Sequence, residues 1–282
     1  MQPIVNNIAD SEVLHRTGRG RIKYDMLDRR EFIAKGFGGL LAVPLAGCSS
    51  LVSGGDWQIS ACKYGEAWLP ESWILPGGDK TKKVPISLMF HLIEFEGHYM
   101  LADVGCDNFE LFGEKATNFV KPAELLRSHG IAPDAIEMCF ISHHHADHVG
   151  SLNSFMDAAV FIQEQEAEKC KSLLARHAGK VTVFADQVQT FGGKVVQRRV
   201  GGHTAGHAVL EIGAGRGKKM VIAGDACYSP VNIARRIPTA TTQNAAESQA
   251  FIERYANGDY AVLLAHDPSI KVPNGIIPLC TA

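Results

Sequence analysis

The chain has 282 residues, of which 46% are hydrophobic, and carries a formal net charge of −2 at pH 7 with an isoelectric point near 6.6. This length is enough for one large α/β domain with a substantial core, and no second folded domain is needed to account for it. The near-neutral charge balance offers no basic stripe for a phosphate backbone, so we expect no nucleic-acid substrate or partner.

The amino-terminal region resembles an export leader. Arg29 and Arg30 precede a short apolar stretch over residues 36–45, which leads into Leu45-Ala46-Gly47-Cys48. The stretch is shorter than the roughly 20 apolar residues needed to span a bilayer, so it is typical of the apolar region of a signal peptide. The order of these features resembles a twin-arginine signal followed by a lipoprotein box, in which Cys48 carries the lipid.

This leader predicts where the protein works. We expect residues 1–55 to be the leader region and residues 56–282 to form the mature domain. The protein would then be exported as a periplasmic or cell-envelope lipoprotein, and it would associate with the membrane only through a lipid on Cys48. The 25 residues before Met26 are unlike the basic start of a signal, so Met26 is the expected initiator.

Next along the chain, an aromatic segment precedes the first predicted strands. Trp57 is followed by Trp68-Leu69 and by Trp73-Ile74-Leu75. These apolar side chains could form the entrance of a ligand pocket, or a cap that packs on the domain. The sequence leaves both interpretations open.

Periodicity then predicts a hairpin, a helix and a buried strand. Residues 85–95, turned at Glu96-Gly97, pair with residues 99–102. Pro122 begins a helix that stops at Gly130, and residues 135–141 form a buried strand. Further strand and helix patterns alternate to Ala265. Periodicity alone therefore indicates a mixed α/β domain with functional loops at strand ends.

The strongest chemical signal directly follows the strand at 135–141. The segment 142–150 contains the pattern H-x-H-x-D-H, with four potential metal ligands in six positions: His143, His145, Asp147 and His148. Buried imidazoles and carboxylates need partners, and a divalent cation supplies one. His143 and His145 alternate along an extended segment and point the same way, while the other two come from the turn beyond. One segment can thus serve two neighbouring metals.

Three more potential ligands follow, each at the end of a predicted strand and beside small residues: His203, Asp225 and His266. In this order the four motifs resemble those of the metallo-β-lactamase superfamily over roughly residues 85–270. The resemblance implies a four-layer αββα sandwich with the metals at one edge between the sheets.

The resemblance also implies a ligand assignment for two zinc ions. One zinc would be bound by His143, His145 and His203, the other by Asp147, His148 and His266, and Asp225 would bridge them. Two cations a few Å apart lower the pKa of a shared water and polarise a substrate carbonyl, which describes a hydrolase without a protein nucleophile. The same ligand types also accommodate iron, cobalt or manganese.

Within the superfamily, the segment from Gly224 to Tyr228 resembles the N-acyl homoserine lactone lactonases. The true β-lactamases generally lack the bridging carboxylate. The resemblance places the Tyr228 hydroxyl at the developing oxyanion, although an ordinary half-buried tyrosine is the alternative, and it lets Asp147 pass a proton to the departing alkoxide. The chain differs at Ala205, where the lactonases usually have proline. The leading hypothesis is a quorum-quenching lactonase acting on small-molecule acyl lactones.

Three other functions stay open at this point. The first is an exported metallo-hydrolase of thioesters, phosphotriesters or sulfate esters with the same metals. The second is an iron-dependent sulfur oxidoreductase, which the complete second ligand set of Asp147, His148 and His266 disfavours. The third is a metal-binding lipoprotein without catalytic activity, although nothing in the ligand set suggests decay.

The remaining polar residues near the motifs have supporting or structural interpretations. Asp103 could orient a metal ligand or simply form a turn, and His207 and Asp267 are expected to support ligands or structure. Ordinary core or surface roles are expected for the other histidines, His91, His98, His129 and His177. Most cysteines other than Cys48 are expected to be small apolar fillers rather than a disulfide framework: Cys62, Cys106, Cys139, Cys170, Cys227 and Cys280.

Overall fold

Two hydrogen-bonded sheets dominate the computed structural model, which describes residues 57–111, 113–177, 181–213 and 219–281. The chain divides into two units, Met1–Gly54 and Gly55–Ala282. The description below concerns the second unit alone. The predicted leader with its twin arginine, Cys48 and Met26 lies outside the described residues.

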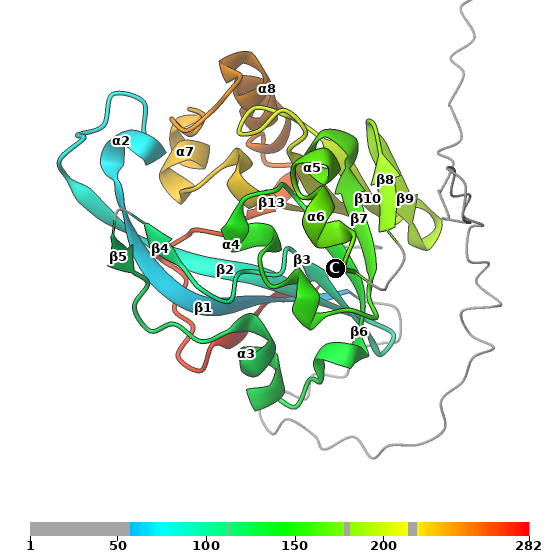
Figure 1. Cartoon of the computed structure of the whole chain (residues 1–282). Coiled ribbons are helices and arrows are strands. Elements are labelled where there is room, and N and C mark those ends of the chain that lie inside the picture. Colours follow the sequence, from blue (N-terminus) through cyan, green and yellow to red (C-terminus); the bar gives the residue numbers. More distant parts are fainter. Residues whose placement is uncertain (1–56, 112, 178–180, 214–218, 282) are drawn as a thin grey trace, which may run out of the picture. The chain divides into compact units, whose positions relative to one another are not determined.

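The larger sheet has seven strands in the order β14-β1-β2-β3-β6-β7-β8 (Figure 1). Its first four strands pair antiparallel, and β3, β6, β7 and β8 run parallel. In sheet order the strands span Ile276–Thr281, Gln58–Pro70, Lys83–Phe95, His98–Ala102, Ile136–Ile141, Ala159–Gln163 and Val181–Phe184.

The smaller sheet has five strands in the order β13-β12-β11-β10-β9. In that order they span Tyr260–Leu263, Lys219–Ile222, Ala208–Ile212, Val195–Arg199 and Gln187–Thr190. A separate short hairpin consists of β4 and β5, at Glu110–Leu111 and Glu114–Lys115.

Short helices cover the sheets (Figure 1). The α-helices α2 to α8 span Glu71–Ile74, Pro122–Ser128, Ala146–Val149, Glu164–Lys169, Lys171–Leu174, Pro230–Arg235 and Ala245–Tyr255. The 3₁₀ turns η1 to η4 span Pro133–Ala135, Leu152–Ser154, Phe191–Gly193 and Gly224–Ala226. Among the helices of the described residues, none has the length and apolar character needed to cross a membrane.

Three hydrophobic cores separate four layers. The first core joins the outer face of the larger sheet to α3 and α5. The second lies between the sheets, where Phe140 and Leu210 are buried. The third joins the smaller sheet to α8 and includes Val221 and Phe251. This arrangement confirms the αββα sandwich.

Strand periodicity explains how one strand serves two cores. Along β11, Leu210 and Ile212 face the core between the sheets, whereas Val209 faces the core under α8. Successive side chains of a strand point to opposite faces, so a strand buried on both sides is apolar at nearly every position. Full burial of each such side chain contributes about 1.5–3 kcal/mol.

The predicted elements agree with the observed ones in position. The hairpin forms as β2 and β3 around Glu96-Gly97, and the helix that begins at Pro122 ends at Ser128. The strand at 135–141 is β6, which begins one residue later because 133–135 form a 3₁₀ turn. The prediction for the cysteines is also confirmed within the described part of the chain, because five are free and buried: Cys62, Cys106, Cys139, Cys170 and Cys227.

Candidate metal centre

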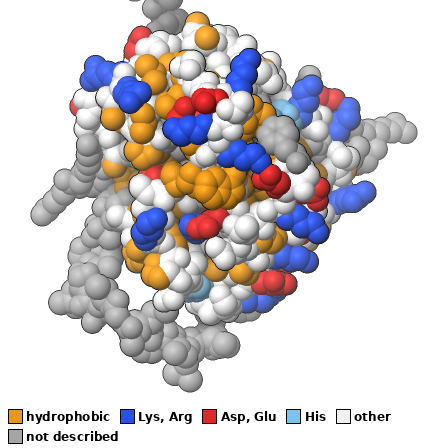
Figure 2. Space-filling view, turned by 90° about the vertical axis from the view of Figure 1, so that its left-hand side faces the viewer, with side chains coloured by type: hydrophobic (Ala, Val, Ile, Leu, Met, Phe, Trp, Pro, Cys, Tyr) orange, Lys and Arg blue, Asp and Glu red, His pale blue; other side chains and the backbone are white. Residues whose placement is uncertain are grey.

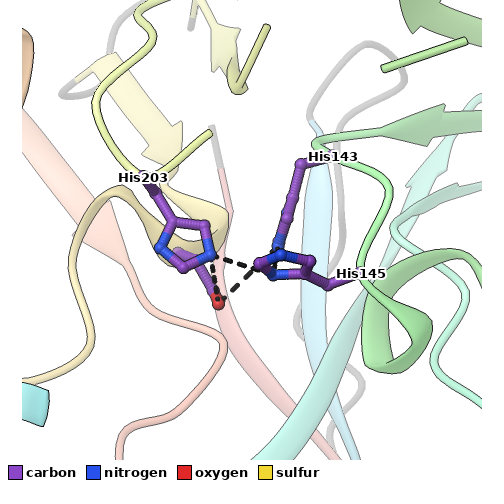
Figure 3. Close-up of side chains that lie close together, drawn as sticks. His143, His145 and His203 are labelled. Atoms are coloured by element: carbon purple, nitrogen blue, oxygen red, sulfur yellow. Dashed lines mark hydrogen bonds and ion pairs between the residues drawn. The ribbon is translucent and has the colours of Figure 1, made fainter. Parts of the chain in front are cut away.

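A first cluster of metal-ligating side chains lies at the carboxyl ends of β6, β10 and β12. It contains His143, His145, His203 and Asp225, whose ligand atoms all lie within 4.8 Å of one another. Nδ1 of His145 is 3.0 Å from Nε2 of His143 and 3.0 Å from Nε2 of His203. Figure 3 shows the three imidazoles pointing toward one another from two different loops.

A second cluster lies beside the first and contains Asp147, His148 and His266. Asp147 and His148 belong to α4, which begins directly after His145, and His266 follows β13. Oδ2 of Asp147 is 3.7 Å from Nε2 of His148 and 3.7 Å from Nε2 of His266. The extended 143–145 segment and the turn after it therefore face two adjacent points.

Asp225 directs one oxygen to each cluster. Its Oδ1 is 2.9 Å from Nε2 of His148 and 3.0 Å from Nε2 of His266. Its Oδ2 is 3.3 Å from Nε2 of His203 and 3.7 Å from Nε2 of His143. A single carboxylate thus connects the two clusters.

The backbone before Asp225 explains how this carboxylate reaches between the loops. Gly224 has φ of 50°, and a Cβ at this position would lie 2.9 Å from Cβ of Ser142 and 3.0 Å from Nε2 of His207. Only glycine fits both the left-handed backbone and this close approach. His207 in turn accepts the backbone N–H of Asp225 at 3.1 Å, so it supports Asp225 from outside both ligand clusters.

The donor set fits a cation of the size of zinc. Tetrahedral Zn–N bonds of about 2.0–2.1 Å would place neighbouring ligand atoms about 3.3 Å apart, which is close to the spacings within the first cluster. Nε2 of His148 and Oδ1 of Asp225 are buried and lie 2.9 Å apart, but among the described residues neither atom has a partner with the angles of a hydrogen bond. Buried polar atoms without such partners are costly unless another group, such as a cation, satisfies them.

Hydrogen bonds outside the clusters orient the imidazoles. His148 donates its Nδ1–H to Oδ2 of Asp103 at 2.8 Å, and His266 donates to the carbonyl of Ser87 at 2.9 Å. His203 donates to the carbonyl of Thr241 at 2.9 Å. Each of these bonds leaves Nε2 facing its cluster, which is the arrangement of a metal-binding histidine.

Asp103 orients more than one ligand. Its Oδ1 accepts the backbone N–H of Ser142 at 2.7 Å, and its Oδ2 accepts the Ser142 hydroxyl at 2.9 Å. Oγ of Ser142 lies 2.9 Å from Nδ1 of His143 and accepts its N–H. Asp103 has φ of 59°, and its side chain is held in this buried network. Of its two sequence interpretations, the orienting one agrees with this geometry.

Burial and the neighbouring carboxylates shift the pKa values of the clustered histidines in opposite directions. Burial, together with neighbouring imidazoles, lowers the pKa of His143 well below its ordinary value. Burial also disfavours charge on His148 and His266, but Asp225 and Asp147 outweigh it and raise the pKa of both imidazoles. Burial would raise the pKa of Asp225, yet His148 and His266 hold it well below the usual range.

Tyr228 contacts the connecting carboxylate. Its hydroxyl donates to Oδ2 of Asp225 at 2.9 Å. Burial, followed by the charge of Asp225, raises the tyrosine pKa well above its ordinary value, so the hydroxyl keeps its proton. The centroid of its ring lies 5.9 Å from that of His203 and 5.1 Å from that of His266.

A cavity of about 410 Å³ opens above the clusters. Five of its lining residues belong to the clusters: His145, Asp147, His203, Asp225 and His266. Its other lining residues are Leu69, Trp73, Ile86, Phe109, Leu111, Tyr228, Thr241, Thr242 and Gln243. Figure 2 shows hydrophobic side chains gathered among charged ones on the side of the molecule that carries α2 and the β4–β5 hairpin.

Some residues of the aromatic segment line the cavity, as expected of a pocket entrance, and others pack on the domain, as expected of a cap. Leu69 and Trp73 line the cavity, whereas Ile74 packs into the first core. Trp57 is buried between the sheets and stacks on Phe95, with ring centroids 4.0 Å apart. Trp68 is 48% exposed and lies outside the lining.

All seven residues predicted as metal ligands lie in the two clusters, and the other histidines of the described residues lie outside them. His91 is buried in β2, where burial lowers its pKa to about 4. Nε2 of His177 donates to the carbonyl of Ala158 at 2.9 Å. Asp267 accepts the backbone N–H of Ser269 at 2.7 Å and so shapes a turn.

Sequence reasoning missed Ser142, Glu166 and most of the cavity wall. The missed wall residues include Ile86, Phe109, Leu111, Thr241, Thr242 and Gln243. They come from three stretches that are far apart in the sequence, at Ile86, at 109–111 and at 241–243, and no motif links these stretches. For Glu166, its place at the start of a helix after a strand was the single sequence signal.

The family comparison agrees with the geometry. Residues 90–266 match the model of the metallo-beta-lactamase superfamily, and no curated protein matches the chain. Solved structures share the fold at low identity. One is a mutant of AiiA from B. thuringiensis with N-decanoyl-L-homoserine bound at the active site, at 20% identity and a TM-score of 0.66, over 78% of this chain and 98% of that chain.

Two further structures are similar. AidC, a dizinc quorum-quenching lactonase in complex with a product, has 17% identity and a TM-score of 0.60 over 81% of this chain and 95% of that chain. A probable metal-dependent hydrolase from Staphylococcus aureus has 18% identity and a TM-score of 0.63 over 77% and 91%. Because the family model covers more than half of its length, the chain belongs to the metallo-beta-lactamase superfamily and is a metallo-hydrolase.

Proposed function

We propose that this protein is a dinuclear metal-dependent lactonase that opens N-acyl homoserine lactones. One observation carries the proposal: Asp225 presents one oxygen to each of two ligand clusters beneath a cavity with apolar walls. The N-decanoyl-L-homoserine bound to the AiiA mutant and the product bound to the lactonase AidC support this choice of substrate.

The proposed metals are two zinc ions or other divalent transition metals. His143, His145 and His203 would hold one ion, and Asp147, His148 and His266 the other, with Asp225 shared. When bound, such a pair supplies a hydroxide near neutral pH and polarises the lactone carbonyl. The dizinc centre of AidC supports the metal type and the number.

Two side chains of the protein would then act on the substrate. The protonated hydroxyl of Tyr228, which lines the cavity and donates to Oδ2 of Asp225 in this structure, would turn from Asp225 to donate its hydrogen bond to the oxyanion that develops on the carbonyl oxygen. Asp147 faces the same cavity with 19% of its side chain exposed, against 3% for Asp225. It is therefore the carboxylate placed to take up the proton of the hydroxyl group that adds to the carbonyl carbon and to pass that proton to the leaving alkoxide.

The cavity wall suits an acyl chain. Leu69, Trp73, Ile86, Phe109 and Leu111 form an apolar surface, and each methylene that they remove from water contributes about 0.8 kcal/mol. Thr242 and Gln243 line the same cavity and supply polar groups for the substrate amide. A small molecule with one polar ring and one apolar tail matches both kinds of wall.

Export as a lipoprotein is also part of the proposal, and it is supported by the sequence alone. The sequence has the features of such a signal in the expected order: Arg29 and Arg30, then the apolar stretch, then Cys48. Placement in the cell envelope would bring the enzyme to lactones that diffuse between cells. Mass spectrometry of the membrane fraction would test it by detecting a lipidated amino terminus at Cys48.

The function is tested by a substrate panel. Protein that begins after Cys48 is loaded with zinc, and proton release is followed with N-acyl homoserine lactones of several chain lengths. We expect rapid ring opening that a chelator abolishes and added zinc restores. Turnover of thioesters, phosphotriesters or sulfate esters without lactone opening would contradict the substrate and leave the metallo-hydrolase assignment in place.

A further inference from the structure

The first metal cluster is built from two loops that are far apart in sequence, and one buried carboxylate outside the ligand set joins them. His143 and His145 lie on the loop after β6, while His203 lies on the loop between β10 and β11. Glu166, in the first turn of α5, contacts both loops and is 1% exposed.

Each oxygen of Glu166 serves one loop. Oε1 accepts the hydroxyl of Thr204 at 2.7 Å and the backbone N–H of Gly206 at 2.8 Å. Oε2 accepts the backbone N–H of His144 at 3.0 Å and also its ring Nδ1–H. Four donors therefore converge on one carboxylate, and each comes from a residue within three positions of a predicted metal ligand.

The space around this carboxylate is filled. A Cβ at Gly206 would lie 2.1 Å from Oε1 of Gln163 and 2.9 Å from Oε1 of Glu166. Gln163 is itself held in place, because it caps α5 by accepting the N–H of Gln165 at 2.6 Å and donates to the carbonyl of Ala185 at 3.0 Å. The helix start is thus a rigid support against which both loops rest.

The second cluster has different supports. His148 is oriented by Asp103 and His266 by the carbonyl of Ser87, and Glu166 contacts neither histidine through its four hydrogen bonds. A change at Glu166 should consequently act on one cluster.

We propose that Glu166 is a positioning residue that sets the separation of His203 from His143 and His145, and thereby the affinity of the first cluster for its metal. The physical reason is preorganisation: ligands held at the correct separation before the ion arrives lose less conformational freedom when it binds. The inference rests on metal binding in the proposed function, but not on the identity of the substrate.

The decisive variant is Glu166→Gln, which keeps the shape of the side chain. An amide has one accepting oxygen and one donating NH₂ group, so in either orientation its NH₂ faces two donors of one loop. Glu166→Asp keeps the charge but is one methylene shorter and cannot reach both loops. Thr204→Val is a milder second variant, because it removes one donor at nearly constant volume.

The metal-free protein is titrated with Co²⁺, and its visible absorption reports binding. Two backgrounds separate the clusters: His266→Ala leaves the first cluster complete, and His203→Ala leaves the second complete. Glu211→Gln is the matched control, because Glu211 accepts hydrogen bonds from Arg198 and Tyr255 away from both ligand loops. Melting temperatures of the metal-free variants report the purely structural effect.

We expect Glu166→Gln to weaken Co²⁺ binding about 10–100-fold in the His266→Ala background and to leave it unchanged in the His203→Ala background. Glu166→Asp should not restore the affinity, Thr204→Val should cause a smaller loss, and Glu211→Gln should change only the melting temperature. Equal losses in both backgrounds, or a lower melting temperature with unchanged affinity, would overturn the proposal. Absence of Co²⁺ binding in both parent backgrounds would overturn the metal assignment as well.

Discussion

Asp103 and His148 form a buried pair in which Nδ1 of the histidine lies 2.8 Å from Oδ2 of the aspartate. The same carboxylate binds Ser142, whose hydroxyl lies 2.9 Å from Nδ1 of His143. Asp103 therefore orients a histidine of each cluster, one directly and one through a serine. Glu166, by comparison, contacts loops of the first cluster alone.

This relationship predicts the effect of Asp103→Asn. The amide cannot accept all three hydrogen bonds that the carboxylate accepts, so both clusters should lose affinity for metal by about 10–100-fold. Isothermal titration of the metal-free protein with zinc would measure both affinities. A loss confined to one site would contradict the shared role.

Asp225→Asn tests the bridging position. The substitution replaces one of the oxygens facing the clusters by an NH₂ group that cannot bind a cation. We expect metal content to fall from two ions to one per chain and turnover to fall by more than the roughly 100-fold typical of losing an outer-sphere partner. Elemental analysis and steady-state kinetics would check both values. Two retained ions with full turnover would exclude the bridge.

Tyr228→Phe tests the proposed oxyanion donor. Loss of one such donor typically lowers kcat about 10²–10³-fold, while KM and metal content should change little because no ligand is removed. Kinetics and elemental analysis on the same preparation would show this split. If metal content falls in parallel with kcat, the hydroxyl acts through Asp225, to which it donates at 2.9 Å.

The dependence of metal binding on pH follows from the second cluster. In the metal-free protein the pKa values of His148 and His266 are raised, so protonation of these imidazoles stabilises the folded state. This contribution is fully present at pH values below about 6.5, the pKa of histidine in the unfolded chain. That contribution is lost as the pH rises through the folded pKa values, whereas metal binds the neutral imidazoles more tightly as protons leave. The melting temperature difference between zinc-loaded and metal-free protein should therefore widen from about pH 6 to pH 8. Calorimetry in two buffers of different ionisation enthalpy would detect the released protons.

Trp73→Ala tests the apolar wall of the cavity. Each added methylene of an acyl substrate that contacts the wall should raise kcat/KM, because it lowers the activation free energy by up to about 0.8 kcal/mol. Removing the indole should reduce this gain for long chains and leave short-chain lactones almost unaffected. Trp68→Ala is the control, because Trp68 is exposed and lies outside the lining. An equal effect of the two substitutions would contradict the wall assignment.

The sequence predicted the metal ligands more fully than the residues that orient them. His143, His145, Asp147 and His148 were readable because local spacing in a six-residue motif already places them near one another. Asp103 was readable as one of two possibilities, since an aspartate after a strand suits a turn as well as a support. Glu166 gave no comparable signal, because its partners lie 22 to 40 positions away in the chain.

The sequence by itself determined a mixed α/β domain and the types of ligand, because alternating apolar residues and short motifs are local properties of the chain. The αββα arrangement was implied by the resemblance of those motifs to a known superfamily. The bridging position of Asp225 was implied by the resemblance, but the tertiary structure alone decided which oxygen faces which cluster, that Glu166 joins the loops, and which side chains line the cavity. These relationships depend on the meeting of strand ends from two sheets. Their packing is a long-range outcome that no local pattern encodes.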